Sequence, residues 1–232
     1  HTHYHISQYQ YPLAYDGWIE VEPEDAPIKR IDITRAHLEE DTGKLYHTDG
    51  ASLIDFNRSG VPLLEIVTEP DFRTPDEVYA YLIKLRTIVR YLGVSSGDME
   101  KGAIRCEPNI SLRPVGTTTL GTKVEVKNLN SFRVVRQALA YEVERQTAIL
   151  ESGGRVDQGT FGWDEANQRT VLQSRKEGSS DYRYFPEPDL PPLTVGREWV
   201  EEIALGMPER PYAKKARFRA DLGLSAYDSA VL

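Results

Sequence analysis

The chain has 232 residues and a net charge of −8, with 40% hydrophobic and 28% charged residues. This length is enough to bury a sizeable core, and the composition is that of an ordinary soluble protein. The acidic balance argues against a surface that coats nucleic acid generally, although it leaves room for a local basic patch. The single cysteine, Cys106, excludes an internal disulfide and a cysteine-rich zinc site.

The sequence contains no apolar run long enough to span a membrane and no signal peptide. We therefore expect a cytoplasmic protein, or one of an organelle matrix, that makes no membrane contact. The chain begins with a histidine rather than a methionine, and we expect a piece of a longer protein. His1, His3 and His5 are compatible with a metal site and equally with an exposed strand.

The first third of the chain predicts β structure followed by a helix. Three segments carry β-branched or aromatic residues with a period near two, residues 17–22, 29–35 and 52–56, and residues 63–67 form a near-continuous apolar strand. Asp49-Gly50 is typical of a hairpin turn. Thr74 is the predicted N-cap of a helix, with Pro75 at its first position, and Gly93 closes its last turn.

Further strands and helices are expected in blocks after this point. We predict strands over residues 102–127, a helix from Ser131 to Gly153, a hairpin over residues 157–174 and short helices over residues 198–232. The fold class is therefore α+β, with a large, mostly antiparallel sheet and packed helices. We expect one domain over residues 1–195 and the start of a C-terminal helical region over residues 196–232.

Two segments alternate polar and apolar residues, which is typical of a strand with one polar face. The polar positions of these segments are Arg105, Glu107, Asn109, Ser111, Arg113, Lys123, Glu125 and Lys127. Together with residues 63–67 they predict a single polar sheet face. The alternative is a solvated antiparallel sheet whose lysines and glutamates form cross-strand ion pairs.

Carboxylates in this pattern are the first candidates for chemistry. Glu65 interrupts an apolar strand, so its charge must be paired, protonated or bound to a cation. Glu40 ends a half-buried strand, pointing with Leu38, whereas Glu39 points with His37. Convergence of Glu40, Glu65 and Glu107 would hold Mg²⁺ together with substrate phosphates.

Basic residues supply the complementary charge. Arg105, Lys123 and Lys127 could neutralise a transferring phosphoryl group, and Lys44 after a glycine turn could meet a phosphate. For Lys44 the alternative is a solvated hairpin tip. The sequence has no P-loop, no kinase-type glycine-rich loop and no serine-hydrolase motif, so any use of nucleotide is of another type.

Long motifs in one order resemble the B subunit of the aspartyl/glutamyl-tRNA amidotransferase family over nearly the whole chain. The motifs are residues 6–9, 37–41 with Gly43-Lys44, 57–71, 105–111, 123–132 and 181–192. The resemblance implies a glutamine-synthetase-like catalytic cradle over residues 1–195, without its front segment. It also implies that ATP and Mg²⁺ serve to phosphorylate the side-chain carboxylate of Glu or Asp mischarged on tRNA.

The resemblance further implies partners and site residues. Ammonia from an amidase subunit would displace the phosphate, a small third subunit of the heterotrimer would wrap the pair, and aminoacyl-tRNA would be the substrate. Glu40 and Glu65 match the Mg²⁺ ligands of the family, and Lys44 joins them as a catalytic residue. The residues that line the matching nucleotide-binding strands are Arg105, Glu107, Asn109, Lys123, Glu125 and Lys127.

Two other functions stay open on the sequence. The chain could be a structural fragment that docks to the amidase subunit without binding nucleotide. It could also be a free-standing ligase of the glutamine-synthetase type that acts on small molecules. The preference between Glu-tRNA(Gln) and Asp-tRNA(Asn) cannot be deduced from these residues.

Overall fold

The computed structural model describes residues 4–175 and 183–231, and the chain forms two compact units. The first unit contains the chain up to Glu22, Pro27–Arg73 and the segment that ends at Leu193. The second contains Pro23–Ala26, the described chain from Thr74 to Arg175 and the segment that starts at Thr194. The chain therefore leaves the first unit after Arg73 and returns to it near its C-terminal third.

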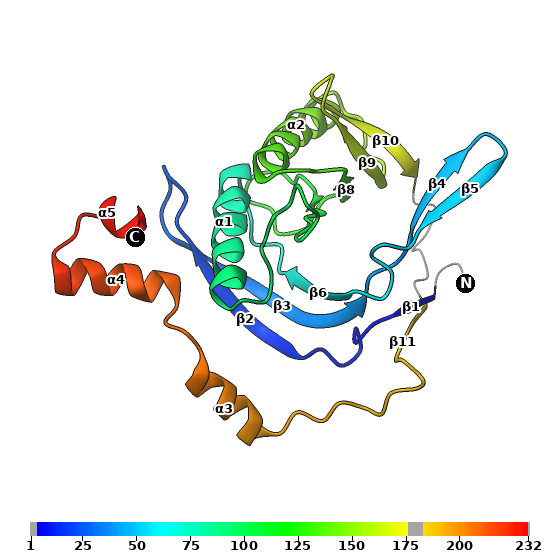
Figure 1. Ribbon diagram of the computed structural model, residues 1–232. Coiled ribbons are helices and arrows are strands. Elements are labelled where there is room, and N and C mark those ends of the chain that lie inside the picture. The colour runs from blue at the N-terminus through cyan, green and yellow to red at the C-terminus, as the bar shows by residue number, and fades with distance from the viewer. Residues whose placement is uncertain (1–3, 176–182, 232) are drawn as a thin grey trace. The chain divides into compact units, whose positions relative to one another are not determined.

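The first unit is built from three small sheets (Figure 1). Its central sheet is antiparallel, in the order β2 (Ala14–Val21), β3 (Lys29–Glu40) and β6 (Pro62–Thr68). A hairpin of β4 (Lys44–Thr48) and β5 (Ala51–Asp55) turns at Asp49-Gly50, and Gly50 adopts a φ of 83°. The third sheet pairs β1 (Tyr4–Ile6) with β11 (Arg183–Phe185) in parallel.

The second unit combines helices with a four-stranded sheet in the order β10-β9-β8-β7. Its strands are β7 (Asn109–Ile110), β8 (Val124–Lys127), β9 (Gly159–Asp164) and β10 (Arg169–Arg175), and its long helices are α1 (Pro75–Tyr91) and α2 (Phe132–Glu151). Strands β8 and β9 are parallel and joined through α2, which makes a βαβ crossover. Val124, Val126, Val134, Ala138 and Trp163 form the centre of the core.

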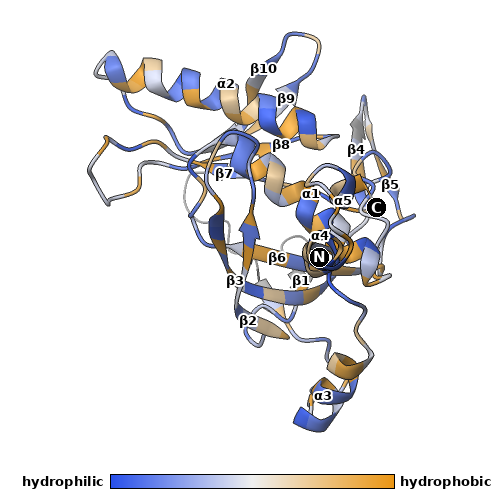
Figure 2. Cartoon of the chain, turned by 90° about the vertical axis from the view of Figure 1, so that its left-hand side faces the viewer, coloured by the Kyte–Doolittle hydropathy of each residue, from blue (hydrophilic) through white to orange (hydrophobic). Residues whose placement is uncertain are grey.

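Local sequence explains both long helices. Thr74 caps α1 by accepting a hydrogen bond from the Glu77 amide at 3.2 Å, and Ser131 caps α2 in the same way from the Val134 amide. Gly93 and Gly153 follow the helix ends with φ values of 69° and 78°, a conformation that glycine adopts without strain. Hydrophobic and hydrophilic residues recur along α2 (Figure 2), which matches its one-sided burial.

Helix α2 is also tied to β10 by a buried polar network. Glu142 is completely buried and accepts two hydrogen bonds from Arg145, at 2.8 Å each. It also accepts hydrogen bonds from the side-chain amide of Gln146 at 2.9 Å and from the Thr170 hydroxyl at 2.5 Å. Every Glu142 oxygen is thus supplied with donors.

The C-terminal part of the second unit consists of α3 (Arg197–Gly206), α4 (Pro211–Leu222) and α5 (Asp228–Val231). Pro211 occupies the start of α4, where its missing amide hydrogen costs nothing. These helices confirm the short helices predicted from the sequence. No helix within the described residues is both long and apolar enough to cross a membrane.

The α+β class and the mainly antiparallel pairing are confirmed, whereas the prediction of one large sheet is wrong. The strands of residues 63–67 and 123–127 belong to different sheets in different units, so they form no common polar face. The predicted strand over residues 105–113 shrinks to Asn109–Ile110. Pro108 explains part of this difference, because it has no amide hydrogen to give to a ladder. The expected domain over residues 1–195 is divided between the two units.

Candidate metal centre

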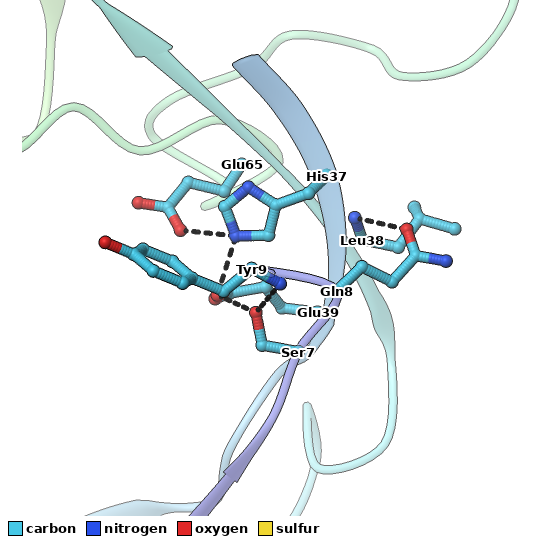
Figure 3. A network of polar contacts seen from close by, with 7 residues as sticks. All are labelled: Ser7, Gln8, Tyr9, His37, Leu38, Glu39 and Glu65. Carbon is cyan, nitrogen blue, oxygen red and sulfur yellow. Dashed lines mark hydrogen bonds and ion pairs between the residues drawn. The ribbon is translucent and has the colours of Figure 1, made fainter. Parts of the chain in front are cut away.

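His37, Glu39 and Glu65 come together on one face of the central sheet in the first unit (Figure 3). The His37 Nε2 atom lies 3.0 Å from a Glu39 oxygen and 3.1 Å from a Glu65 oxygen. The three potential ligand atoms all lie within 4.8 Å of one another. We refer to these three residues as the candidate metal centre.

Strand register explains why these residues meet. His37 of β3 stands directly opposite Glu65 of β6 in an antiparallel pair, so the two side chains leave the sheet on the same side. Glu39 follows His37 by two residues and therefore shares its face. The alternation of β3 thus fixes the face, and the register with β6 supplies the second carboxylate.

Residues 7–9 cover this face from the N-terminal segment (Figure 3). The Ser7 hydroxyl donates a hydrogen bond to the Glu39 carboxylate at 2.8 Å. Gln8 is attached to β3 at two points. Its backbone N–H donates a hydrogen bond to the Leu38 carbonyl, and its side-chain oxygen accepts one from the Leu38 backbone N–H. The Tyr9 ring meets His37 edge-on at 6.0 Å between centroids and stacks on Tyr184 at 4.7 Å. These contacts give Glu39 and His37 fixed positions.

Burial and charge differ within the centre. The His37 side chain is completely buried and Glu39 is 7% exposed, whereas Glu65 is 44% exposed. Burial raises the pKa of the Glu65 carboxyl above its ordinary value, and the nearby Glu39 carboxylate raises it further, while His37 lowers it. Two carboxylates share one imidazole nitrogen, which carries at most one proton. A cation at this position would relieve the repulsion between them.

The imidazole also has an unused nitrogen. His37 Nδ1 is buried and has no hydrogen-bond partner among the described residues. A histidine held only for structure normally satisfies both ring nitrogens, so this pattern is unusual for a purely structural residue. The side chains of His1, His3 and His5, considered above as a metal site, lie outside the described residues.

The structure does not bring Glu40 to Glu65. Glu40 stands opposite Pro62 in the same register, three residues beyond His37, and because this separation is odd its side chain leaves the sheet on the other face. One of its oxygens lies beside Gly60, in the loop that joins β5 to β6. Its role as a metal ligand stays a prediction that rests on the resemblance.

Lys44 lies at the start of β4, in the separate hairpin. It is exposed, and its ammonium sits 4.8 Å from the centre of the Tyr46 ring. This placement is that of a solvated side chain on a hairpin, which was the alternative considered from the sequence. Its predicted phosphate contact is left as a prediction.

The polar residues predicted to bind nucleotide belong to the second unit. Asn109 of β7 pairs with Glu125 of β8. The Lys127 ammonium lies 3.1 Å from Glu107 and 3.7 Å from Glu125, and Glu125 accepts a hydrogen bond from Thr160. The predicted alternation of β8 is confirmed, because Val124 and Val126 are completely buried on its other side. Arg105 and Lys123 are exposed and lie outside the strands.

Cys106 is not a nucleophile in this environment. Burial, followed by the charge of Glu107, raises the pKa of its thiol to about 12. The residue is therefore a neutral thiol at physiological pH.

Two residues of the candidate metal centre, His37 and Glu39, were not selected from the sequence. The alternation in β3 already put them on one face, but nothing in it said which face meets Glu65. That information lies in the register between two strands separated by a hairpin. Of the two carboxylates, Glu39 is the more buried and Glu65 is half-buried.

Comparison with known proteins assigns the chain to the family of a catalytic domain. The family model of the "GatB/GatE catalytic domain" matches residues 1–201, and the chain therefore belongs to this family. It is 55% identical over 99% of its length to the B subunit of the aspartyl/glutamyl-tRNA(Asn/Gln) amidotransferase of Roseiflexus sp. (strain RS-1). The same identity and coverage are found for the protein of that name from Streptococcus pneumoniae (strain Hungary19A-6). The chain spans about half the length of these relatives, 47% and 48% respectively.

Proposed function

We propose that this chain carries the carboxylate-activating site of a tRNA-dependent amidotransferase. In this proposal ATP phosphorylates the side-chain carboxylate of Glu or Asp attached to the wrong tRNA, with Mg²⁺ held by the Glu39 and Glu65 carboxylates beside His37. Ammonia then displaces the phosphate to give the amide. The fold would correspond to a glutamine-synthetase-like cradle.

The observation that carries the proposal is the cluster of two carboxylates and one imidazole on a single sheet face. A carboxylate is a poor electrophile until its oxygen becomes part of a better leaving group, and phosphorylation provides that group. A phosphoryl donor and a carboxylate acceptor are both anionic, so their approach requires positive charge. Mg²⁺ held by Glu39 and Glu65 would supply that charge.

The residues present fit a hard divalent cation. Mg²⁺ takes oxygen ligands at about 2.0–2.1 Å, is usually held by one or two carboxylates, and keeps its other positions for water and substrate phosphates. Glu39 and Glu65 supply the two carboxylates, and the half-exposed Glu65 marks the side from which substrate can approach. The His37 Nε2 atom contacts both carboxylates, at 3.0 and 3.1 Å, and so helps to hold them side by side.

The remaining parts of the proposal concern substrates and partners. The names of the relatives specify tRNA(Asn/Gln) and a B subunit, which is the basis for aminoacyl-tRNA as substrate and for a multi-subunit enzyme. An amidase subunit would deliver ammonia, and a small third subunit would complete the assembly.

One observation favours the second candidate function, a subunit that docks to the amidase without binding nucleotide. Lys127, predicted to meet phosphates, is held between Glu107 and Glu125. Its charge is already paired with two carboxylates, one from the same strand and one from the segment that precedes β7.

Calorimetric titration of ATP with and without Mg²⁺ separates the two functions. We expect saturable binding that requires Mg²⁺, and its loss in Glu65→Gln, which removes a ligand charge from a half-exposed side chain without emptying the core. Glu20→Gln, an exposed carboxylate of β2, is the matched control and should bind as the unmodified chain does. If the unmodified chain shows no Mg²⁺-dependent binding, or Glu65→Gln retains it, the metal-site proposal is wrong.

A further inference from the structure

Arg35 is a cationic side chain next to the candidate metal centre that the proposed function leaves without a role. It precedes His37 by two residues in β3, so both side chains leave the same face of the sheet. Its strand partner is Val67, two residues from Glu65, which makes Arg35 and Glu65 diagonal neighbours. The charge of Arg35 also lowers the pKa of Glu65, although burial and Glu39 outweigh it.

The guanidinium of Arg35 is held in place by an aromatic ring. Its central carbon lies 3.7 Å from the centre of the Tyr9 ring, and Tyr9 in turn stacks on Tyr184 at 4.7 Å with planes 8° apart. Residues 7–9 are themselves bonded to β3 through Gln8 and Leu38. A guanidinium that lies on a ring uses its flat face for that contact and keeps its N–H groups free in the plane.

One N–H group of this cation lacks an acceptor. Within residues 4–175 and 183–231, Arg35 Nε is buried and has no hydrogen-bond partner. The Glu39 and Glu65 carboxylates of the same face contact His37 Nε2. A buried guanidinium N–H without an acceptor is costly, and an incoming anion would remove that cost.

We propose that Arg35 is the oxyanion-binding residue of the candidate metal centre. Its N–H fork receives a carboxylate or phosphate oxygen of the substrate beside the metal, and Tyr9 holds the fork at the required angle. This inference rests on the proposed function, since the anion approaches the face that Glu39 and Glu65 occupy. The fork suits planar carboxylates and phosphates alike because both offer two oxygens at matching spacing.

The test separates metal binding from anion binding. Mn²⁺, which can be followed directly by electron paramagnetic resonance, is first titrated into the unmodified chain and into Arg35→Gln and Arg35→Lys. Inorganic phosphate and, separately, acetate are then titrated at saturating Mn²⁺. Circular dichroism checks that each variant is folded. Lys29→Gln, a half-buried cation at the start of the same strand, is the matched control.

We expect Mn²⁺ affinity to change less than about twofold in both variants, because Arg35 is not a ligand. Anion affinity should fall roughly tenfold to a hundredfold, the loss that accompanies removal of a charge-assisted hydrogen bond. A loss confined to phosphate assigns the site to a phosphoryl group, and a loss confined to acetate assigns it to the substrate carboxylate. Arg35→Lys keeps the charge but not the fork, so it should lose most of this affinity too.

Other outcomes overturn the inference. Unchanged anion affinity in both variants would mean that Arg35 does not bind the substrate. Equal losses of Mn²⁺ and anion affinity would mean that it only balances the charge of the carboxylates. If Arg35→Gln does not fold, Arg35→Lys decides alone. An unmodified chain that binds no Mn²⁺ contradicts the proposed function itself, which is a different result from any of these.

Discussion

Glu142 in the second unit and Glu65 in the first are both carboxylates on packed elements, but they differ in how their charge is compensated. Glu142 receives hydrogen bonds from Arg145, Gln146 and Thr170, and these outweigh the effect of burial, so that the pKa of Glu142 is lowered. Glu65 shares one imidazole nitrogen with a second carboxylate, and its pKa is raised. A complete set of donors indicates a structural charge, whereas an incomplete set indicates a place for a ligand.

The largest effect expected from this comparison is on stability. Glu142→Gln leaves Arg145 without its counter-charge inside the α2–β10 packing, and we expect unfolding free energy to fall by about 3 kcal/mol. Urea unfolding measures it. Glu144→Gln, an exposed residue of the same helix, is the control and should change stability by less than about 0.5 kcal/mol. Equal effects of the two substitutions would contradict a structural role for Glu142.

The same residue predicts a dependence on pH. Because the pKa of Glu142 is lower in the folded than in the unfolded chain, its stabilising contribution is fully present above the unfolded value and disappears as the pH falls through the folded one. The stability difference between the unmodified chain and Glu142→Gln should therefore shrink between pH 7 and pH 3. A stability difference that stays constant over this range would show that the folded chain does not favour the ionised form of Glu142 over the protonated form.

At the candidate metal centre, two neighbouring glutamates on opposite faces of β3, Glu39 and Glu40, can be compared directly. Glu39→Gln should weaken Mn²⁺ binding by at least about tenfold, the loss seen even when a residue behind a metal ligand is replaced. Glu40→Gln, facing away from Glu65, should leave it within about twofold. Calorimetry measures both. If Glu40→Gln weakens Mn²⁺ binding and Glu39→Gln does not, Glu40 is the metal ligand, as the resemblance implies, and the assignment of Glu39 from the strand register is wrong.

The smallest effect is expected at Lys127. Its ion pairs with Glu107 and Glu125 are partly exposed, and such pairs contribute about 0–1 kcal/mol. We expect Lys127→Gln to lower the unfolding free energy by less than about 1 kcal/mol in a urea titration. A loss of stability as large as that of Glu142→Gln would mean that the ion pairs of Lys127 are structural charges of the same kind as Glu142.

Sequence patterns predicted what depends on neighbours along the chain. The caps Thr74 and Ser131, the turn at Asp49-Gly50 and the buried side of β8 were all correct, since each follows from a few adjacent residues. The pairing of strands was not predicted correctly, because alternation fixes which residues of a strand share a face but not which other strand lies beside that strand. The register that pairs His37 with Glu65 could therefore not be predicted, and residues 105–113 were assigned to one long strand.

The parallel pair of β1 and β11 has a consequence for how the protein is made. Tyr9 and Tyr184 lie at nearly opposite ends of the first unit's sequence, with most of the second unit between them. Contacts this distant form late, because the intervening chain must first become compact. During synthesis the N-terminal strands emerge long before Tyr184 does. The ring stack that holds Arg35 in place is therefore among the last contacts of the first unit to form, after residues 74–175 of the second unit have been synthesised.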